Sequence, residues 1–394
     1  MTLFTQEDYK TRITAIQKLL TEKELDIAVF NHPAELYYYT GSVIPLYCIM
    51  PKEGVPILLA RKGSSRIKDE SPNMPLEIFS GSKDFISIIK KHFSSRILKA
   101  GFALESSSYS SVVRMLSLLG NPETVDISWD IRMLCSVKSD TEIAIQRKAG
   151  EIISAIPEII RKVYKPGITE LEMSAHIEFY LRTHGAGSLR CRQEGIVLAP
   201  GVFSAGTNSL SSNKFDGICA GTGLSPALPF GASVMKIPSN TSIICDYGFV
   251  FEGYHVDMTR MFSVGSPPAE ALKAHEAMLS VEKDVIDALK AGASWESLWM
   301  KAEESAGNLG YTELFMGIGS EKVKFVGHGV GLYLDEPPYL APKMPDIIRE
   351  NMVIAIEPKV SLPGIGVVGI EDTFVVTASG AICITDCPKD FYIL

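Results

Sequence analysis

Two aspartates lie within apolar, strand-like segments in the C-terminal half of the sequence. Asp246 interrupts the run Ser242–Val250, and Asp257 lies in the next run, Tyr254–Phe262, after a turn at Glu252-Gly253. The two aspartates are roughly equidistant from this turn, so an antiparallel hairpin places them opposite or diagonal to each other. A carboxylate in such a run is costly unless it is paired or binds a metal. We therefore expect both aspartates to belong to one site.

A second pair of carboxylates repeats this arrangement. Glu357 lies in the apolar run Met352–Pro358, and Glu371 lies in the run Val367–Val376, which follows after a loop. A Gly-His-Gly-Val-Gly segment stands between the two predicted hairpins. Its glycines let the backbone approach closely, while His328 projects its side chain into the site.

Two aspartates, two glutamates and one histidine on strand interiors predict a site for two divalent metals bridged by carboxylates. Two cations remove the like-charge repulsion that would otherwise prevent several carboxylates from converging. Four oxygen donors and one imidazole favour Mn²⁺, Fe²⁺ or Co²⁺, and Zn²⁺ is also compatible. Such a metal pair can deprotonate a water molecule and polarise a carbonyl group.

Each of these residues taken alone has a simpler interpretation that involves no metal. A single strand carboxylate is more often exposed or ion-paired, and a single histidine beside glycines is more often structural. The glycine run lacks the strand–GxGxxG–helix context of a dinucleotide-binding loop. The metal site is the interpretation that accounts for all five residues together.

These positions resemble the creatinase, aminopeptidase P and prolidase superfamily of pita-bread metallopeptidases. The order Asp, Asp, His, Glu, Glu matches, and so do the surrounding motifs: Asp-Tyr-Gly, Asp-Met-Thr-Arg, Gly-His-Gly-Val-Gly, Ile-Glu-Pro and Glu-Asp-Thr. Residues 12–62 are similar to the N-terminal domain of creatinase-type proteins. The resemblance covers nearly the whole chain.

The resemblance implies a fold and a set of residue roles. It implies an α/β N-terminal domain followed by an α+β pita-bread domain, in which a curved antiparallel sheet with pseudo-two-fold symmetry is covered by helices. Asp257 and Glu371 are then bridging metal ligands. The implied ligands are Asp246, Asp257, His328, Glu357 and Glu371. Their neighbours in the motifs are expected to support them: Thr259, Arg260 and Thr373.

Two positions depart from the pattern of the family's peptidases. A Pro-His pair usually precedes the first aspartate, at a position that falls here on Pro229-Phe230, and a histidine in a His-Glu-x-Pro segment is replaced here by Asp335. Phe230 can neither donate a hydrogen bond nor move a proton, and Asp335 donates only when it is protonated. We expect Asp335 to take a catalytic role and Phe230 to contact the substrate. His255, two residues before Asp257, shares its strand face and is a further candidate for substrate binding.

The elements that position these residues fall into two predicted domains, residues 1–135 and 136–394. Strands and helices alternate in the first, which is typical of an α/β layer domain without a chemical cluster. In the second, Ser139–Glu142 is a capping box that opens a long amphipathic helix ending at Lys165-Pro166-Gly167, and Thr169–Glu172 is another capping box. The segments 165–170 and 290–296 form a faint repeat, so the domain is expected to contain two halves, each with helices followed by a hairpin.

Composition excludes several classes of protein. The chain has 394 residues and a formal net charge of −8, so it lacks the surplus of Lys and Arg that nucleic-acid or anionic-membrane binding needs. The seven cysteines contain no CxxC pair, and no signal peptide or transmembrane run is visible. We expect a cytoplasmic protein, and the resemblance implies a homodimer.

Three functions stay open on the sequence alone. The first is a dinuclear-metal hydrolase resembling Xaa-Pro dipeptidase or aminopeptidase P, in which metal-bound water attacks a peptide carbonyl. The second is a pita-bread metalloenzyme with other small-molecule chemistry, a C–N hydrolase or a lyase, and the third is a catalytically silent binding homologue. The segment Gly195–Pro238, rich in Gly, Ser and Pro, is expected to wall a pocket for a small peptide or another small, partly apolar substrate.

Overall fold

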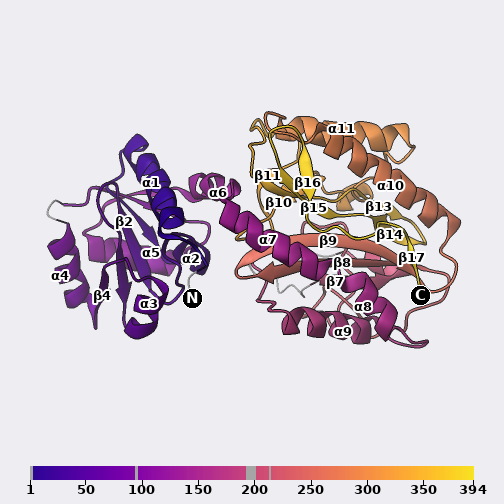
Figure 1. The fold of residues 1–394 in the computed structure, drawn as a ribbon, viewed down its shortest axis with the longest axis horizontal. Coiled ribbons are helices and arrows are strands. Elements are labelled where there is room, and N and C mark those ends of the chain that lie inside the picture. Colours follow the sequence, from indigo (N-terminus) through magenta and orange to yellow (C-terminus); the bar gives the residue numbers. More distant parts are fainter. Residues whose placement is uncertain (1–2, 94–95, 192–200, 213) are drawn as a thin grey trace. The chain divides into compact units, whose positions relative to one another are not determined.

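The computed structural model describes residues 3–93, 96–191, 201–212 and 214–394. The chain forms two compact units, Met1–Cys135 and Ser136–Leu394, and Figure 1 labels most of their helices and many of their strands. The first residues of the predicted pocket wall, 195–200, and residue 213 lie outside the described residues.

The N-terminal unit is built on a six-stranded mixed sheet with the order β4-β3-β2-β1-β5-β6. Strand β1 pairs antiparallel with β2 and parallel with β5, and its four residues are all buried. The strands are β1 (Ile27–Phe30), β2 (Tyr47–Pro51), β3 (Ile57–Ala60), β4 (Leu76–Ile78), β5 (Lys99–Phe102) and β6 (Glu123–Asp126). The helices are α1 (Gln6–Glu22), α2 (Pro33–Thr40), α3 (Ser64–Glu70), α4 (Ser82–His92), α5 (Tyr109–Leu119) and α6 (Ser128–Ser136).

The first helices of the C-terminal unit begin at both predicted capping boxes. Ser139 and Glu142 cap α7 (Asp140–Ile153), and Thr169 and Glu172 cap α9 (Glu170–Thr183). The single long helix predicted after Ser139 is wrong, because the chain breaks it into α7 and α8 (Ile156–Val163). The break precedes Pro157, which has no backbone N–H to continue the hydrogen-bond ladder of α7.

Three sheets make up the centre of the C-terminal unit. Their strand orders are β17-β9-β8-β7, β11-β10-β12-β15-β16 and β13-β14. Figure 1 shows α7, α8 and α9 on one side of these sheets and α10 and α11 on the other. The pita-bread architecture that the sequence predicts is thus present. The remaining elements are β7 (Gly201–Ala205), β8 (Ser242–Phe251), β9 (Tyr254–Ser263), α10 (Ala269–Ala288), α11 (Trp295–Asn308), β10 (Gly327–Gly329), β11 (Glu336–Tyr339), β12 (Val353–Ile356), β13 (Lys359–Leu362), β14 (Gly366–Gly369), β15 (Asp372–Val376), β16 (Ala381–Cys383) and β17 (Tyr392–Ile393).

The second predicted hairpin is longer and more irregular than expected. Strand β12 pairs with β15, and β13 pairs with β14, so the two arms of the hairpin are each broken in the middle. Glu357 and Pro358 form the break in one arm, and Ile370 and Glu371 form the break in the other. Each predicted glutamate ligand therefore lies where regular strand pairing stops.

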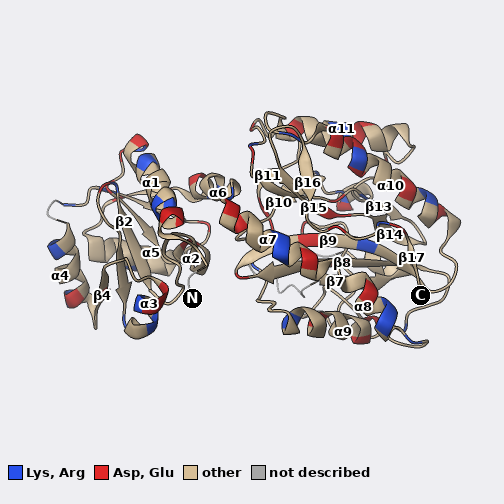
Figure 2. Cartoon of the chain, viewed as in Figure 1, with Lys and Arg blue, Asp and Glu red and all other residues tan. Residues whose placement is uncertain are grey.

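The outer helices carry both signs of charge. Figure 2 shows acidic and basic segments along both α10 and α11, so the excess of acidic residues in the chain is not concentrated on these helices. No helix in the described part of the chain is long and apolar enough to cross a membrane.

Candidate metal centre

The two aspartates lie on one face of the β8–β9 hairpin. Asp246 is paired in register with Thr259, and Asp257 is paired with Gly248. The two aspartates are therefore diagonal neighbours, which is one of the two arrangements that the sequence predicts. Residues two positions apart on paired strands point to the same side of a sheet, so both carboxylates face the same space.

A short backbone bridge brings the second hairpin against the first. The N–H of Thr259 donates to the carbonyl of Glu371 at 3.2 Å, and the N–H of Glu371 donates to the carbonyl of Thr259 at 3.4 Å. On the other side of the second hairpin, His328 on β10 lies opposite Ala355 on β12. The bridge and the β10–β12 pairing bring His328 and Glu371 toward the aspartates of the first hairpin.

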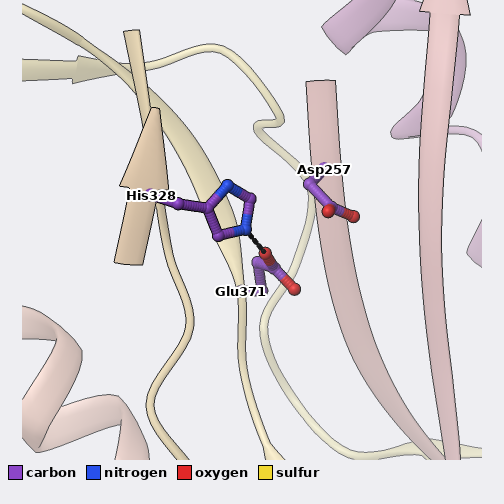
Figure 3. Close-up of side chains that lie close together, drawn as sticks. All are labelled: Asp257, His328 and Glu371. Carbon is purple, nitrogen blue, oxygen red and sulfur yellow. Dashed lines mark ion pairs between the residues drawn. The ribbon is translucent and has the colours of Figure 1, made fainter. Parts of the chain in front are cut away.

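Three of the predicted ligands form a compact group. One ligand atom from each of Asp257, His328 and Glu371 lies within 4.8 Å of the other two (Figure 3). His328 Nε2 is 3.9 Å from Glu371 Oε1 and 3.4 Å from Glu357 Oε1. All of these side chains are buried, and Glu371 Oε1 accepts no hydrogen bond from the described residues.

The pKa shifts of Asp257, Glu371 and His328 indicate an excess of buried negative charge. Burial and the charge of Asp246 raise the pKa of Asp257 to about 7. Burial and Asp257 hold the pKa of Glu371 well above its usual range. Burial disfavours the charged form of His328, yet the neighbouring carboxylates, first of all Glu357, raise its pKa to about 10. A divalent cation would supply the positive charge that protons otherwise provide here.

One residue of the site was missed by the sequence interpretation. Lys359 Nζ donates hydrogen bonds to Asp246 Oδ2 at 3.1 Å, Glu357 Oε2 at 2.7 Å and Glu371 Oε2 at 2.8 Å. The lysine is buried, and these carboxylates, led by Asp246, raise its pKa although burial acts in the opposite direction. Its position two residues after Glu357 in a strand-like run was the available signal, since such residues tend to share a face.

A cavity of about 170 Å³ opens onto these groups. Phe230 and Asp335, the two departures from the family pattern, both line it. Phe230 packs edge-on against Phe215 with the ring centres 5.9 Å apart. The predicted pocket-wall segment therefore contributes apolar surface to the cavity, in its described part.

Three residues predicted to support the ligands touch them or their backbone. Thr259 Oγ1 donates to Glu371 Oε2 at 2.9 Å. Thr373 Oγ1 donates to the carbonyl of Asp257 at 2.8 Å and accepts from the N–H of Asp257 at 3.0 Å. Arg260 donates to the carbonyl of Glu371 at 2.9 Å.

His255 does not lie at the cavity. It is fully buried, its Nδ1–H donates to the carbonyl of Gly331 at 2.8 Å, and its Nε2 accepts from the backbone N–H of Arg190 at 3.0 Å. Burial lowers its pKa to about 3, which keeps the ring neutral. The printed contacts of His255 with described residues join strands and loops, so they give no support to the substrate-binding role expected from the sequence.

The residues fit one divalent ion. Asp257, His328 and Glu371 supply three converging donors, and the orphaned Glu371 Oε1 is the kind of atom that a cation would satisfy. Asp246 Oδ2 and Glu357 Oε2, where a second ion would bridge the hairpins, are bonded to Lys359. With the lysine in this position, the residues do not fit the second predicted ion.

Known proteins resemble this chain along almost its full length. It is 27% identical over 387 residues to the Xaa-Pro dipeptidase of Pyrococcus furiosus, covering 97% of this chain and 99% of that protein. It is 28% identical over 299 residues to the uncharacterized peptidase YqhT of Bacillus subtilis, covering 76% of each. The prolidase structure from Pyrococcus horikoshii OT3 superposes with a TM-score of 0.80 at 26% identity, over 96% of this chain and 99% of that one.

Two family descriptions divide the chain between them. Residues 12–135 match the creatinase/prolidase N-terminal domain, and residues 144–378 match metallopeptidase family M24. The resemblance drawn from the motifs and the prediction of a metallopeptidase are confirmed, and the alternative functions are not favoured. With its hairpins, its carboxylate–histidine group and these matches, the chain belongs to metallopeptidase family M24, within the creatinase, aminopeptidase P and prolidase superfamily.

Proposed function

We propose that the protein is a metal-dependent dipeptidase that hydrolyses Xaa-Pro dipeptides. The observation that carries the proposal is the buried group of Asp257, His328 and Glu371 beside a small cavity in a family M24 chain. The names of the relatives, Xaa-Pro dipeptidase and prolidase, support the substrate class. Mn²⁺, Co²⁺ or Fe²⁺ suits the donor set, and Zn²⁺ is compatible.

The cavity suits a small substrate with an apolar ring and a positive amino group. Phe230, Phe325 and Leu334 offer apolar surface on which a proline ring can pack. Asp335 lines the same cavity and can attract the α-ammonium of a dipeptide. Among the described residues that line the cavity, Lys359 is the one lysine or arginine, so the lining is strongly acidic.

The chain's own residues divide the work of hydrolysis. When bound, a divalent ion supplies a Lewis acid that polarises the peptide carbonyl and makes a bound water more acidic. Asp257, His328 and Glu371 would hold it. Glu357 is kept ionised, because Lys359 and His328 lower its pKa to about 2 against the effect of burial. Its Oε1 can accept a hydrogen bond from the attacking water and orient it, while its Oε2 stays bonded to Lys359 at 2.7 Å.

The absence of a histidine at Phe230 and Asp335 should make the reaction slow. Removing one donor to the transition state typically costs about 10²–10³-fold in rate. With neither histidine present, we expect measurable hydrolysis with a low kcat. The proposal further includes the homodimer and the cytoplasmic location that the sequence and its resemblance imply, and a division into an N-terminal domain and a catalytic domain at residues 135–136.

A dipeptide panel tests the proposal. Metal-stripped protein is reloaded with Mn²⁺ or Co²⁺ and incubated with Ala-Pro, Leu-Pro and Phe-Pro, beside Leu-Ala and N-acetyl-Leu-Pro as controls. We expect cleavage of the Xaa-Pro dipeptides, and its loss in the His328→Ala variant. If loaded wild-type protein leaves all dipeptides intact, the proposal fails.

A further inference from the structure

We propose that the ammonium group of Lys359 takes the place of a second divalent cation, so that the site holds a single divalent ion. The proposal rests on the proposed function, because it takes metal binding by Asp257, His328 and Glu371 as its starting point. The lysine joins oxygens from β8, from the β12–β13 break and from the β14–β15 break. By joining carboxylates from three separate segments, the ammonium group does what a bridging metal ion would do.

The geometry leaves no room for a second ion between the same oxygens. Lys359 Nζ lies 2.7–3.1 Å from Asp246 Oδ2, Glu357 Oε2 and Glu371 Oε2. First-row divalent ions bind carboxylate oxygens at about 2.0–2.2 Å. An ion at that distance from all three oxygens would lie within bonding distance of the ammonium nitrogen. The ammonium and the ion therefore exclude each other.

Charge balance favours one ion together with the lysine. The four carboxylates carry −4 when ionised, and two divalent ions alone would neutralise them. With the ammonium present, one divalent ion leaves the group near −1, whereas two ions would leave it near +1 and place three cations side by side. Like charges at such distances repel strongly in a buried site.

The fold is shaped to keep the lysine where it is. Lys359 is 1% exposed, and it lies opposite Gly369 in the β13–β14 pair. A Cβ atom at Gly369 would come within 2.5 Å of Lys359 Cγ, so the lysine stem occupies space that only a glycine leaves open. The backbone of Lys359 is also fixed, since its carbonyl accepts from the N–H of Met316 at 2.9 Å.

The remaining donors are sufficient for one ion. Glu371 Oε2 is bonded to Lys359 and Thr259, whereas Oε1 has no hydrogen-bond partner in the described part of the chain. Glu371 Oε1 faces His328 Nε2 at 3.9 Å, and Asp257 completes the group (Figure 3). The lysine and the ion would then share Glu371, one on each oxygen.

Metal counting on wild-type protein tests the inference directly. Full-length protein is stripped with chelator, titrated with Mn²⁺ and analysed for bound metal per chain and by electron paramagnetic resonance. We expect one Mn²⁺ per chain with the spectrum of an isolated ion. Two ions per chain with a spin-coupled spectrum overturn the inference while leaving a metal-dependent hydrolase intact. No bound ion at this site overturns both the inference and the proposed function.

The variant Lys359→Ala tests the role of the lysine itself. Removing its side chain frees three oxygens and takes away one positive charge, so we expect a second Mn²⁺ to bind and the spectrum to show a coupled pair. Lys138→Ala is the matched control, because Lys138 is equally buried in the same unit but pairs with Glu336 at 2.7 Å. The control should keep one ion per chain.

The result that rejects the lysine's role is a folded Lys359→Ala protein that still binds one ion with an isolated-ion spectrum. If Lys359→Ala does not fold without metal, the wild-type count still decides the question. Refolding the variant in Mn²⁺ supplies the second measurement. Recovery of folded protein with two ions per chain supports the substitution of an ion by the lysine, and recovery with one ion contradicts it.

Discussion

Glu170 ties together the two ends of a segment that lines the cavity. It is the first residue of α9 and is fully buried. Its Oε1 accepts from the N–H of Ala205 at 2.7 Å, and its Oε2 accepts from Asn208 Nδ2 at 2.7 Å and from the N–H and Oγ of Ser233 at 3.0 and 2.6 Å. The chain between Ala205 and Ser233 includes Phe230, so Glu170→Gln should loosen one wall of the cavity.

The size of the effect follows from these four hydrogen bonds. In the least costly orientation, the glutamine amide nitrogen takes the place of Oε1 and confronts the N–H of Ala205. The N–H of Ala205 and the amide hydrogen that faces it are then both without an acceptor, at about 1–3 kcal/mol for an unsatisfied buried donor, and three charge-assisted bonds become neutral and weaker. We expect a loss of about 2–4 kcal/mol in the free energy of unfolding of the C-terminal unit, or roughly 10 °C in its melting temperature.

Urea and thermal unfolding of metal-free protein measure this loss, and dipeptide KM reports on the cavity wall. The matched control is Glu172→Gln in the same helix turn. Glu172 is exposed and, among the described residues, accepts hydrogen bonds from Thr169 alone, so its variant should lose much less stability than Glu170→Gln and keep its KM. A Glu170→Gln loss below about 1 kcal/mol would refute the reasoning, as would an unchanged KM combined with the full stability loss.

Three further predictions concern the buried network and the altered catalytic positions. Burial lowers the pKa of His275, so the ring binds protons more weakly in the folded than in the unfolded state. The free energy of unfolding should therefore fall as pH drops below about 6.5, by at most about 1.4 kcal/mol per pH unit. The His275→Gln variant should lack this contribution, so its urea midpoint should fall less than that of wild type between pH 8 and pH 5.5. Phe230→His combined with Asp335→His restores two donors and should raise kcat/KM for Leu-Pro at least ten-fold in a stopped assay; an unchanged or lower value would mean that the cavity has been remodelled around other chemistry. Thr259→Val removes the hydrogen bond to Glu371 Oε2, and a loss of about 1–2 kcal/mol in metal-free stability is expected, whereas a neutral effect would show that Lys359 alone satisfies that oxygen.

The sequence predicts the first hairpin well because its register is determined locally. Asp246 precedes the turn at Glu252-Gly253 by six residues and Asp257 follows it by four, so the spacing allows only opposite or diagonal pairing. The second hairpin has a longer loop and two internal breaks, at Glu357-Pro358 and Ile370-Glu371. Such breaks cannot be predicted from alternation, because irregular residues satisfy their backbone through contacts with distant strands, as Glu371 does with Thr259.

Strand alternation also explains why the sequence predicts a substrate-binding role for His255 and gives no role to Lys359. Alternation gives the face of a residue but not the contacts of its side chain, and both ring nitrogens of His255 are bonded to the backbone of Gly331 and Arg190. Lysine side chains are usually exposed, and a lysine ammonium does not bind metals, so a pattern of metal ligands in the sequence does not include Lys359.

The contacts of Lys359 reach residues at very different distances along the chain. Its carboxylate partners are 2, 12 and 113 residues away in sequence. Only the nearest of them, Glu357, is within the range of a local pattern. A buried lysine becomes favourable only after the other two carboxylates have been brought to the same point, and an isolated one would shift its pKa and lose its charge. The positive charge at this site is therefore a consequence of the assembled fold, whereas each of the four carboxylates is visible in its own strand.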